Sequence, residues 1–160
     1  MKKIHLTKGQ ATLVDDEDYE FLNQWKWHTS YYGYANRRRH IKSTRKNQKF
    51  EMIKMHRLIT ECPDGMYVDH INGDRLDNRK SNLRVCTNAQ NSANQRLRAS
   101  NTSGYKGVVL DKRRNRWVAQ IKVNYKTRRY GSFATPLEAA KVYNEKAKEA
   151  WGEYAKVNEC

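Results

Sequence analysis

Long hydrophobic runs are missing from this 160-residue chain. No apolar stretch approaches the roughly 20 residues that a membrane-spanning helix needs. The N-terminal sequence MKKIHLTKGQATLV contains lysines but no apolar core and no small-residue cleavage site. A secretory signal requires both of these features, so we expect neither a membrane protein nor a secreted one.

Cysteine is scarce as well. The three cysteines are an odd number and form no CxxC pair. This spacing argues against a disulfide framework and against a structural zinc ribbon. It is typical of a protein that works in a reducing cytoplasm.

Acidic residues are few beside basic ones, with 17 Asp and Glu against 32 Lys and Arg and a net charge of +15. Residues 37–49 hold seven basic residues and no acid, and residues 96–130 hold eleven against Asp111 alone. Neutralising phosphates releases counterions, which favours nucleic acid as the partner. A solvated cationic face and an anionic membrane surface are the alternatives, and the abundant aromatic residues favour nucleic acid over both.

The apolar pattern predicts an α+β chain. Residues 1–50 alternate short apolar runs with turns, which indicates strands around a short helix. Residues 52–59 predict a short helix, 67–71 and 82–85 two strands, and Thr87-x-x-Gln90 a capping box that starts a helix to about Leu97. This order is a strand hairpin with a helix laid on it.

A small-residue linker at 99–104 precedes a second pattern. Residues 105–111, 116–123 and 128–133 predict a three-stranded meander, and Thr135-Pro-Leu-Glu138 predicts a helix start. That helix should stop at Gly152 and cover one face of the sheet. We therefore divide the chain into an N-terminal segment 1–50, a motif at 51–98, the linker and a domain at 105–160.

The stretch DHINGDRLDNRKSNLR, residues 69–84, contains residues suited to hydrolysing a phosphodiester. That reaction needs a base for the attacking water, a Lewis acid at the phosphate and stabilisation of the leaving oxygen. Carboxylate and amide oxygens suit Mg²⁺, and a neutral imidazole accepts a proton near pH 7. The simplest interpretation of Asn72-Gly73 and Asp77-Asn78 is that they form turns.

This stretch, with the Asn-rich segment after it and His56-Arg57-Leu58 before it, resembles the ββα-metal motif of phage HNH homing endonucleases. The resemblance covers most of residues 4–97. It implies that His70 is the general base, Asn82 orients His70, and Asp69 and Asn91 bind the metal, in the variant whose last motif position is Asn. Asn88 and Asn94 are alternatives for that last position. The metal implied is Mg²⁺, with Mn²⁺ as an alternative.

Two further side chains could support the active site. His56 makes either a structural hydrogen bond or a contact with phosphate or the active site. Arg84, like its basic neighbours Arg75, Arg79 and Lys80, either touches phosphate or is solvated.

Residues 101–158 resemble an AP2 domain, through Ser103-Gly-Tyr-Lys-Gly-Val108, Trp117-Val-Ala-Gln-Ile121, Tyr130-Gly-Ser-Phe133 and Thr135-Pro-Leu-Glu-Ala-Ala140. That family places its three-stranded sheet in the DNA major groove with the helix behind. Period-two alternation agrees, because it places Trp117, Ala119 and Ile121 on one face of the strand and Arg116, Gln120 and Lys122 on the other. The expected DNA face is Lys106, Arg116, Gln120, Lys122 and Arg129.

Together these observations predict a site-specific DNA endonuclease of the homing type. We expect it to act on double-stranded DNA as a monomer in the cytoplasm of a bacterial host, encoded by a phage or mobile element. The first alternative is a non-catalytic AP2-type DNA-binding regulator with a decayed nuclease half. An RNA-binding or RNA-cleaving protein is the other, and no RNP-type or KH-type signature supports it.

Overall fold

The computed structural model describes residues 1–44, 47–97, 99–123 and 126–160. The chain folds into two compact units, Met1–Thr87 and Asn88–Cys160. This division differs from the expected one, which placed the linker at residues 99–104. The boundary comes earlier because the short helix α3 (Asn88–Ala93) packs against elements of the second unit.

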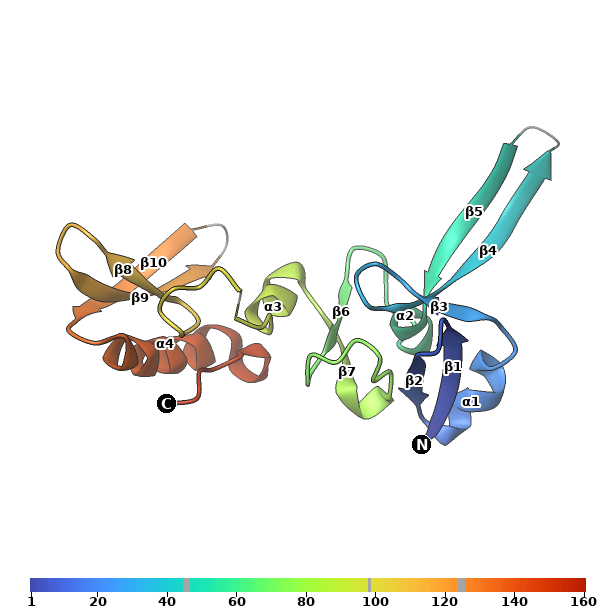
Figure 1. Cartoon of the computed structure of the whole chain (residues 1–160), viewed down its shortest axis with the longest axis horizontal. Coiled ribbons are helices and arrows are strands. Elements are labelled where there is room, and N and C mark those ends of the chain that lie inside the picture. Colours follow the sequence, from blue (N-terminus) through green and yellow to red (C-terminus); the bar gives the residue numbers. More distant parts are fainter. Residues whose placement is uncertain (45–46, 98, 124–125) are drawn as a thin grey trace. The chain divides into compact units, whose positions relative to one another are not determined.

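The first unit is built on a five-stranded sheet in the order β2-β1-β3-β4-β5 (Figure 1). All neighbouring strands are antiparallel except the β1–β3 pair. Helix α1 (Asp16–Leu22) connects β2 to β3, in agreement with the predicted strands around a short helix. The strands are β1 (Lys2–Thr7), β2 (Ala11–Val14), β3 (Trp27–Thr29), β4 (Ala35–Thr44) and β5 (Asn47–Lys54).

The core of this unit follows from strand alternation. Ile4 and Leu6 on β1 are buried while their neighbours face solvent, as period two requires. Trp27 is fully buried, and its indole N–H donates to the carbonyl oxygen of Leu22 at 2.8 Å. Trp27 is therefore a core residue.

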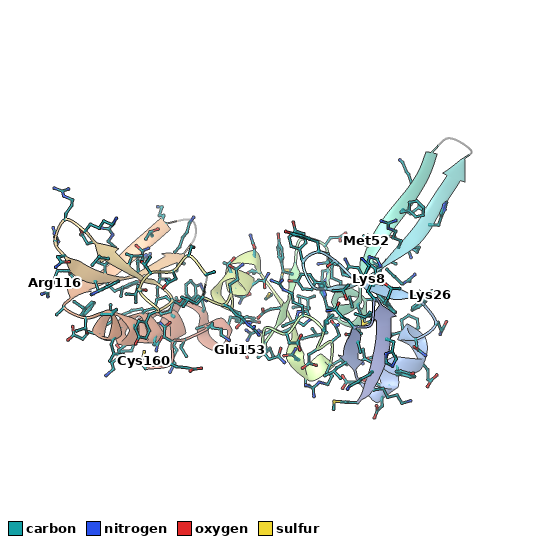
Figure 2. The ribbon with its side chains drawn as sticks, viewed as in Figure 1. Lys8, Lys26, Met52, Arg116, Glu153 and Cys160 are labelled. Atoms are coloured by element: carbon teal, nitrogen blue, oxygen red, sulfur yellow. The ribbon has the colours of Figure 1, made fainter. Side chains whose placement is uncertain are left out.

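Strands β4 and β5 form a long hairpin that extends away from the rest of its unit (Figure 1). Phe50 and Met52 on β5 are exposed although apolar, and Figure 2 shows Met52 near the base of the hairpin. Arg37 on β4 lies over the ring of Trp25, with its guanidinium carbon 4.1 Å from the ring centroid. The base of the hairpin is thereby anchored to the core.

The predicted nuclease hairpin follows. Helix α2 (Met55–Ile59) begins three residues later than expected, because β5 continues to Lys54. Strands β6 (Tyr67–His70) and β7 (Leu83–Cys86) pair antiparallel, with a short 3-10 turn, η1 (Lys80–Asn82), just before β7. The predicted pair of strands is thus confirmed.

The second unit is a three-stranded antiparallel sheet in the order β10-β9-β8, with one long helix on one face. Its elements are β8 (Val108–Asp111), β9 (Arg116–Val123), β10 (Lys126–Phe133), α4 (Pro136–Trp151) and the 3-10 turn η2 (Gly152–Tyr154). Ala119 and Ile121 of β9 are buried against α4. The predicted meander and covering helix are both present.

The ends of α4 match the sequence signals. The Thr135 side chain accepts from the backbone N–H of Glu138, and the Glu138 carboxylate accepts from the backbone N–H of Thr135. This reciprocal pair is a capping box. Helix α3, by contrast, ends at Ala93 rather than near Leu97.

No helix in the described ranges combines the length and the apolar character that a bilayer crossing requires. The cysteines Cys62, Cys86 and Cys160 form no disulfide bond.

Candidate active site and nucleic-acid interface

His70 ends strand β6 and is 4% exposed. Its ring Nε2 lies 3.2 Å from Oδ1 of Asn78, which is fully buried. Burial lowers the pKa of His70, opposed by the Asn78 hydrogen bond and the nearby carboxylates. The imidazole is therefore neutral at pH 7, which is the form that can accept a proton.

A second histidine lies beside it. The ring centroids of His56, on α2, and His70 are 5.3 Å apart, and the Tyr34 ring lies 4.9 Å from His56. Burial, with His70 close by, lowers the pKa of His56 to about 3. Nδ1 of His56 is buried and has no hydrogen-bond partner among the described residues. His56 thus belongs to the same cluster as the predicted general base.

Asp69, the residue before His70, is buried and faces Arg84 across the hairpin. The two residues are register partners, and Nε and Nη2 of Arg84 donate to Oδ2 of Asp69 at 2.9 and 2.8 Å. A buried carboxylate is stable only when paired or hydrogen-bonded. Arg84 therefore pairs with the Asp69 carboxylate inside the protein.

The predicted role of Asn82 requires a correction. Its amide does not reach His70: Oδ1 accepts from the backbone N–H of Asn72 at 3.0 Å, and Nδ2 donates to the carbonyl oxygen of Asp77 at 2.8 Å. Asn82 is the last residue of η1, and its side chain links two backbone positions of the loop that joins β6 to β7. Asn82 closes the loop, and Asn78 makes the contact with the histidine ring.

The loop between β6 and β7 is held by its own polar side chains. Asn72 accepts from the backbone N–H of Asp74 at 2.8 Å and donates to the Asp77 carboxylate at 2.9 Å. Asp77 also binds Arg79 through two contacts of 2.7 and 2.6 Å, and Arg79 lowers the pKa of Asp77. The turn chemistry expected for this stretch is present, and it makes the loop a rigid support.

The basic residues around the loop are engaged within the protein. Arg75 donates to the carbonyl oxygen of Tyr32 at 2.6 Å, and Arg79 pairs with Asp77. Lys80 lies 2.5 Å from a carboxylate oxygen of Glu17, on the acidic helix α1. Arg75 and Lys80 therefore link the loop to the segment after β3 and to helix α1, whereas the Arg79 pair lies within the loop.

The two predicted metal ligands, Asp69 and Asn91, carry the oxygen donors that a hard divalent cation prefers. Asp69 supplies a carboxylate, and the other predicted ligand, Asn91, is half-buried on α3 in the second unit. Among the described residues, no three His, Cys, Asp or Glu side chains gather closely enough to hold a metal ion. A ligand set of one carboxylate, one amide oxygen and substrate oxygens is of the kind that Mg²⁺ accepts.

In the second unit the sheet has a covered face and an open face. Arg116, Lys122 and Arg129 are exposed and Gln120 is half-buried, as the period-two pattern predicts. Gln120 and Arg129 are cross-strand partners, so their side chains share one face. A groove of about 630 Å³ is lined by Lys112, Arg113, Arg114, Arg129 and neighbouring β8 and β9 residues. The open face is therefore basic.

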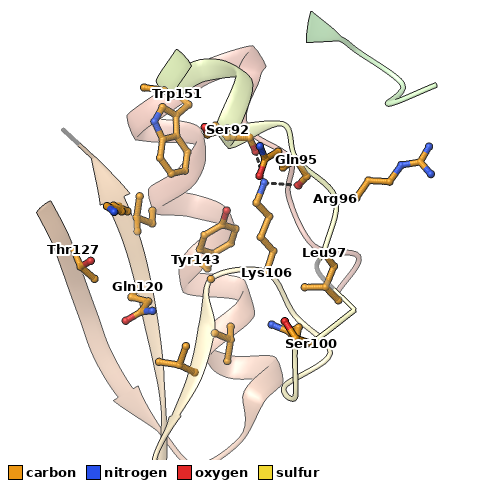
Figure 3. A pocket seen from close by; sticks show the side chains of 18 of the residues that line it. Ser92, Gln95, Arg96, Leu97, Ser100, Lys106, Gln120, Thr127, Tyr143 and Trp151 are labelled. Carbon is orange, nitrogen blue, oxygen red and sulfur yellow. Dashed lines mark hydrogen bonds between the residues drawn. The ribbon is translucent and has the colours of Figure 1, made fainter. Parts of the chain in front are cut away.

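Lys106 does not belong to that open face. Its ammonium donates to the carbonyl oxygen of Gln95 at 2.8 Å and to that of Ala93, at the end of α3 (Figure 3). These carbonyls close a helix, where a cation is favourable. The prediction that placed Lys106 among DNA contacts is thus replaced by a structural role.

Two residues of the site were not identified from sequence. Asn78 was interpreted as turn chemistry, although a fully buried asparagine eight residues after the histidine is its ring partner. Thr12, on β2, contacts Asn78 across 66 positions of sequence. No local pattern signals a contact over that separation.

Comparison with known proteins gives an independent result. The profile of the HNH endonuclease family matches residues 54–93, which include α2, the hairpin and α3. An "Uncharacterized HNH endonuclease L560" of Acanthamoeba polyphaga mimivirus is 29% identical over 157 residues, 94% of this chain and 76% of the viral protein. "Protein 3.8" of Escherichia phage T7 is 33% identical over 94 residues, 59% of this chain and 77% of the phage protein. No solved structure matches the chain.

Proposed function

Because the chain belongs to the HNH endonucleases, we propose that it is a homing-type enzyme that hydrolyses phosphodiester bonds of double-stranded DNA. The observation that carries this proposal is the pair Asp69 and His70, both buried and both held by dedicated partners. A decayed nuclease would have no need to keep such a pair ordered.

The proposed cofactor is one Mg²⁺ ion, with Mn²⁺ as a substitute. Asp69 and Asn91 would hold it through their side-chain oxygens, Asn91 being the residue at the last position of the motif. Bound there, the ion would act as a Lewis acid on the scissile phosphate. Softer metals are less suited to oxygen ligands.

The chain's own residues supply the proton transfer. His70, neutral at pH 7, takes a proton from the attacking water as that water's oxygen bonds to phosphorus and the bond to the leaving oxygen breaks. The proton is held on the imidazole, and the leaving oxygen is protonated from solvent. Arg84, bound to Asp69, adds a positive charge where the phosphate approaches.

We assign DNA selection to the open face of the second unit, in the AP2-like manner. Gln120 and Arg129 are cross-strand neighbours with side chains able to read base edges. Arg116 and Lys122 flank them on the same strand face, and Figure 2 shows Arg116 on the sheet. Arg113 and Arg114 in the adjoining turn would contact phosphates.

The basic strand β4 supports DNA as the partner of the first unit too. Arg38 is exposed on β4 and Lys49 on β5, whereas Arg39 pairs with Glu51 and Arg37 packs on Trp25. Lys42, Arg45 and Lys46, in the same basic run, have side chains outside the described residues.

Supercoiled plasmid tests the proposal. The wild-type protein should nick or linearise it with Mg²⁺ or Mn²⁺ and do nothing with EDTA. His70→Ala should slow cleavage by roughly 10²–10⁴-fold, the usual contribution of a general base. His5→Ala, an exposed histidine on β1, is the matched control and should cleave normally. Equal cleavage by the His70 variant would refute the assigned base.

The same experiment separates the alternative function. A non-catalytic AP2-type regulator would retard duplex DNA in a gel but leave the plasmid intact with every metal. Preferential degradation of RNA over duplex DNA would instead favour the hypothesis of an RNA-cleaving protein.

A further inference from the structure

The loop that carries Asn78 is docked on the edge of the N-terminal sheet. The backbone N–H of Leu13 donates to the carbonyl oxygen of Leu76 at 2.8 Å, and the N–H of Asn78 donates to the carbonyl oxygen of Leu13 at 2.8 Å. Leu13 and Asp77 form a parallel bridge. The adjacent side chains of Thr12 and Asn78 are both 0% exposed, so their hydrogen bonds are made inside the protein.

The hydroxyl of Thr12 has one proton, and its position follows from the distances. Thr12 Oγ1 lies 2.7 Å from the carbonyl oxygen of Leu76. Two oxygens at this distance need a proton between them, and only the hydroxyl can provide it. The Met55 sulfur, 4.0 Å away, is a much weaker acceptor for the same proton. Oγ1 can therefore only accept from its other neighbour.

That neighbour is the Asn78 side chain, 2.7 Å from Thr12 Oγ1. Since the hydroxyl proton is already committed, Asn78 must present its NH₂ group to Thr12. Its carbonyl oxygen then points to Nε2 of His70, 3.2 Å away. A carbonyl oxygen cannot donate, so the proton of this hydrogen bond must come from the ring nitrogen.

We propose that Thr12 is a positioning residue for the proposed nuclease reaction. Through Asn78 it keeps the proton of the neutral His70 ring on Nε2, so that the lone pair that accepts the proton of water is on Nδ1. The hydrogen bonds run in one direction, from His70 to Asn78, from Asn78 to Thr12 and from Thr12 to the Leu76 carbonyl. When Nδ1 takes a proton, the Nε2–H bond to Asn78 is kept.

This inference rests on the proposed function only for its catalytic meaning. The direction of the hydrogen bonds is a property of the protein alone. It also assigns a role to the N-terminal sheet, because β2 supplies the residue that orients the amide of Asn78. A sheet that only supported the hairpin would not need a hydroxyl at position 12.

Long-range proton–nitrogen NMR of the histidine rings tests the direction without metal or DNA. Spectra of the full chain in EDTA, with His70 assigned by comparison with His70→Gln, should show an Nε2-protonated ring. This measurement needs no variant of Thr12. A proton on Nδ1 would overturn the inference, whatever the nuclease assay shows.

Two variants of Thr12 test the role of its hydroxyl. Thr12→Val has nearly the same volume but neither donates nor accepts, so the Asn78 amide loses its constraint, and the His70 ring should populate both tautomers. Its kcat should fall at least about tenfold with little change in KM. Thr12→Ser keeps the hydroxyl and should restore both the spectrum and the turnover.

Thr29→Val on β3 is the matched control, because the Thr29 hydroxyl is buried with no hydrogen-bond partner among the described residues. It should leave tautomer and turnover as in the wild type. If Thr12→Val behaves like this control, Thr12 merely packs and the inference is wrong. If the wild type shows the Nε2 proton yet cleaves no DNA with any metal, the proposed function fails while the hydrogen-bond direction stands.

Discussion

Two histidines buried side by side have a consequence for stability in acid. The pKa of His56 is about 3 in the folded protein, because burial disfavours the imidazolium, against an ordinary value of 6.5. The unfolded chain therefore binds more protons than the folded protein between these values. The contribution of the neutral His56 to the free energy of unfolding is therefore fully present above about pH 6.5 and is lost as the pH falls towards 3.

We expect His56→Gln to flatten this dependence. In EDTA, the free energy of unfolding of the wild type should fall by up to several kcal/mol between pH 7 and pH 4, and less steeply in the variant. Denaturant titrations at several pH values measure both slopes. His5→Gln, on an exposed position, should keep the wild-type slope, and an unchanged slope in His56→Gln would contradict the assignment.

For single residues, the sequence indicated which side chains could take part in catalysis, but it did not indicate their hydrogen-bond partners. The adjacency of Asp69 and His70 marked them as candidate site residues, and both are buried, as is His56. The orienting residue was misassigned to Asn82, because both asparagines follow the histidine in one polar loop. Which of them faces the ring depends on how that loop docks on β2.

Among the elements, the β6–β7 hairpin, the three-stranded meander and the start of α4 were predictable from local rules. Thr135, Pro136 and Glu138 mark the helix start because capping satisfies backbone N–H groups that the helix leaves unpaired. The end of α3 was not predictable in this way. The carbonyl oxygen of Ala93, its last residue, accepts hydrogen bonds from Lys106 and Lys156, which lie elsewhere in the chain. Tertiary partners for its carbonyls decided where it stops.

One glycine tests the packing of α4 on the sheet. Gly107 has φ of +72°, and a Cβ there would lie 2.0 Å from the ring of Tyr143 on α4. Gly107→Ala should therefore destabilise the second unit by about 2–4 kcal/mol, from backbone strain and overpacking together. Thermal unfolding measures the loss. Gly104→Ala has the same sign of φ but open space around it, so a loss as large there would show that strain alone is responsible.

At the scale of the whole molecule, the proposed function assigns DNA selection and DNA cleavage to different parts of the chain. If the open sheet face selects the DNA and His70 cuts it, Arg129→Ala should lose about 1–3 kcal/mol of discrimination between cognate and other sites. Its turnover at saturating DNA should remain close to that of the wild type. Competition binding in EDTA and single-turnover cleavage measure the two quantities. Lys106→Ala is the comparison, because that ammonium serves α3, and unchanged selectivity in Arg129→Ala would refute the assigned face.

Local information was enough for this protein's composition-level and short-range features. The excess of basic residues, the adjacency of Asp69 and His70, and the alternation of β9 are written in neighbouring positions, because charge, turn chemistry and strand periodicity act over a few residues. Local sequence patterns could not predict contacts between distant segments of the chain. Thr12 meets Asn78 only because a loop bridges to the edge of β2, and burial then forces each polar group to find a partner. The candidate nuclease residues Asp69 and His70 stand out in the sequence, whereas the hydrogen bonds that orient them arise from folding.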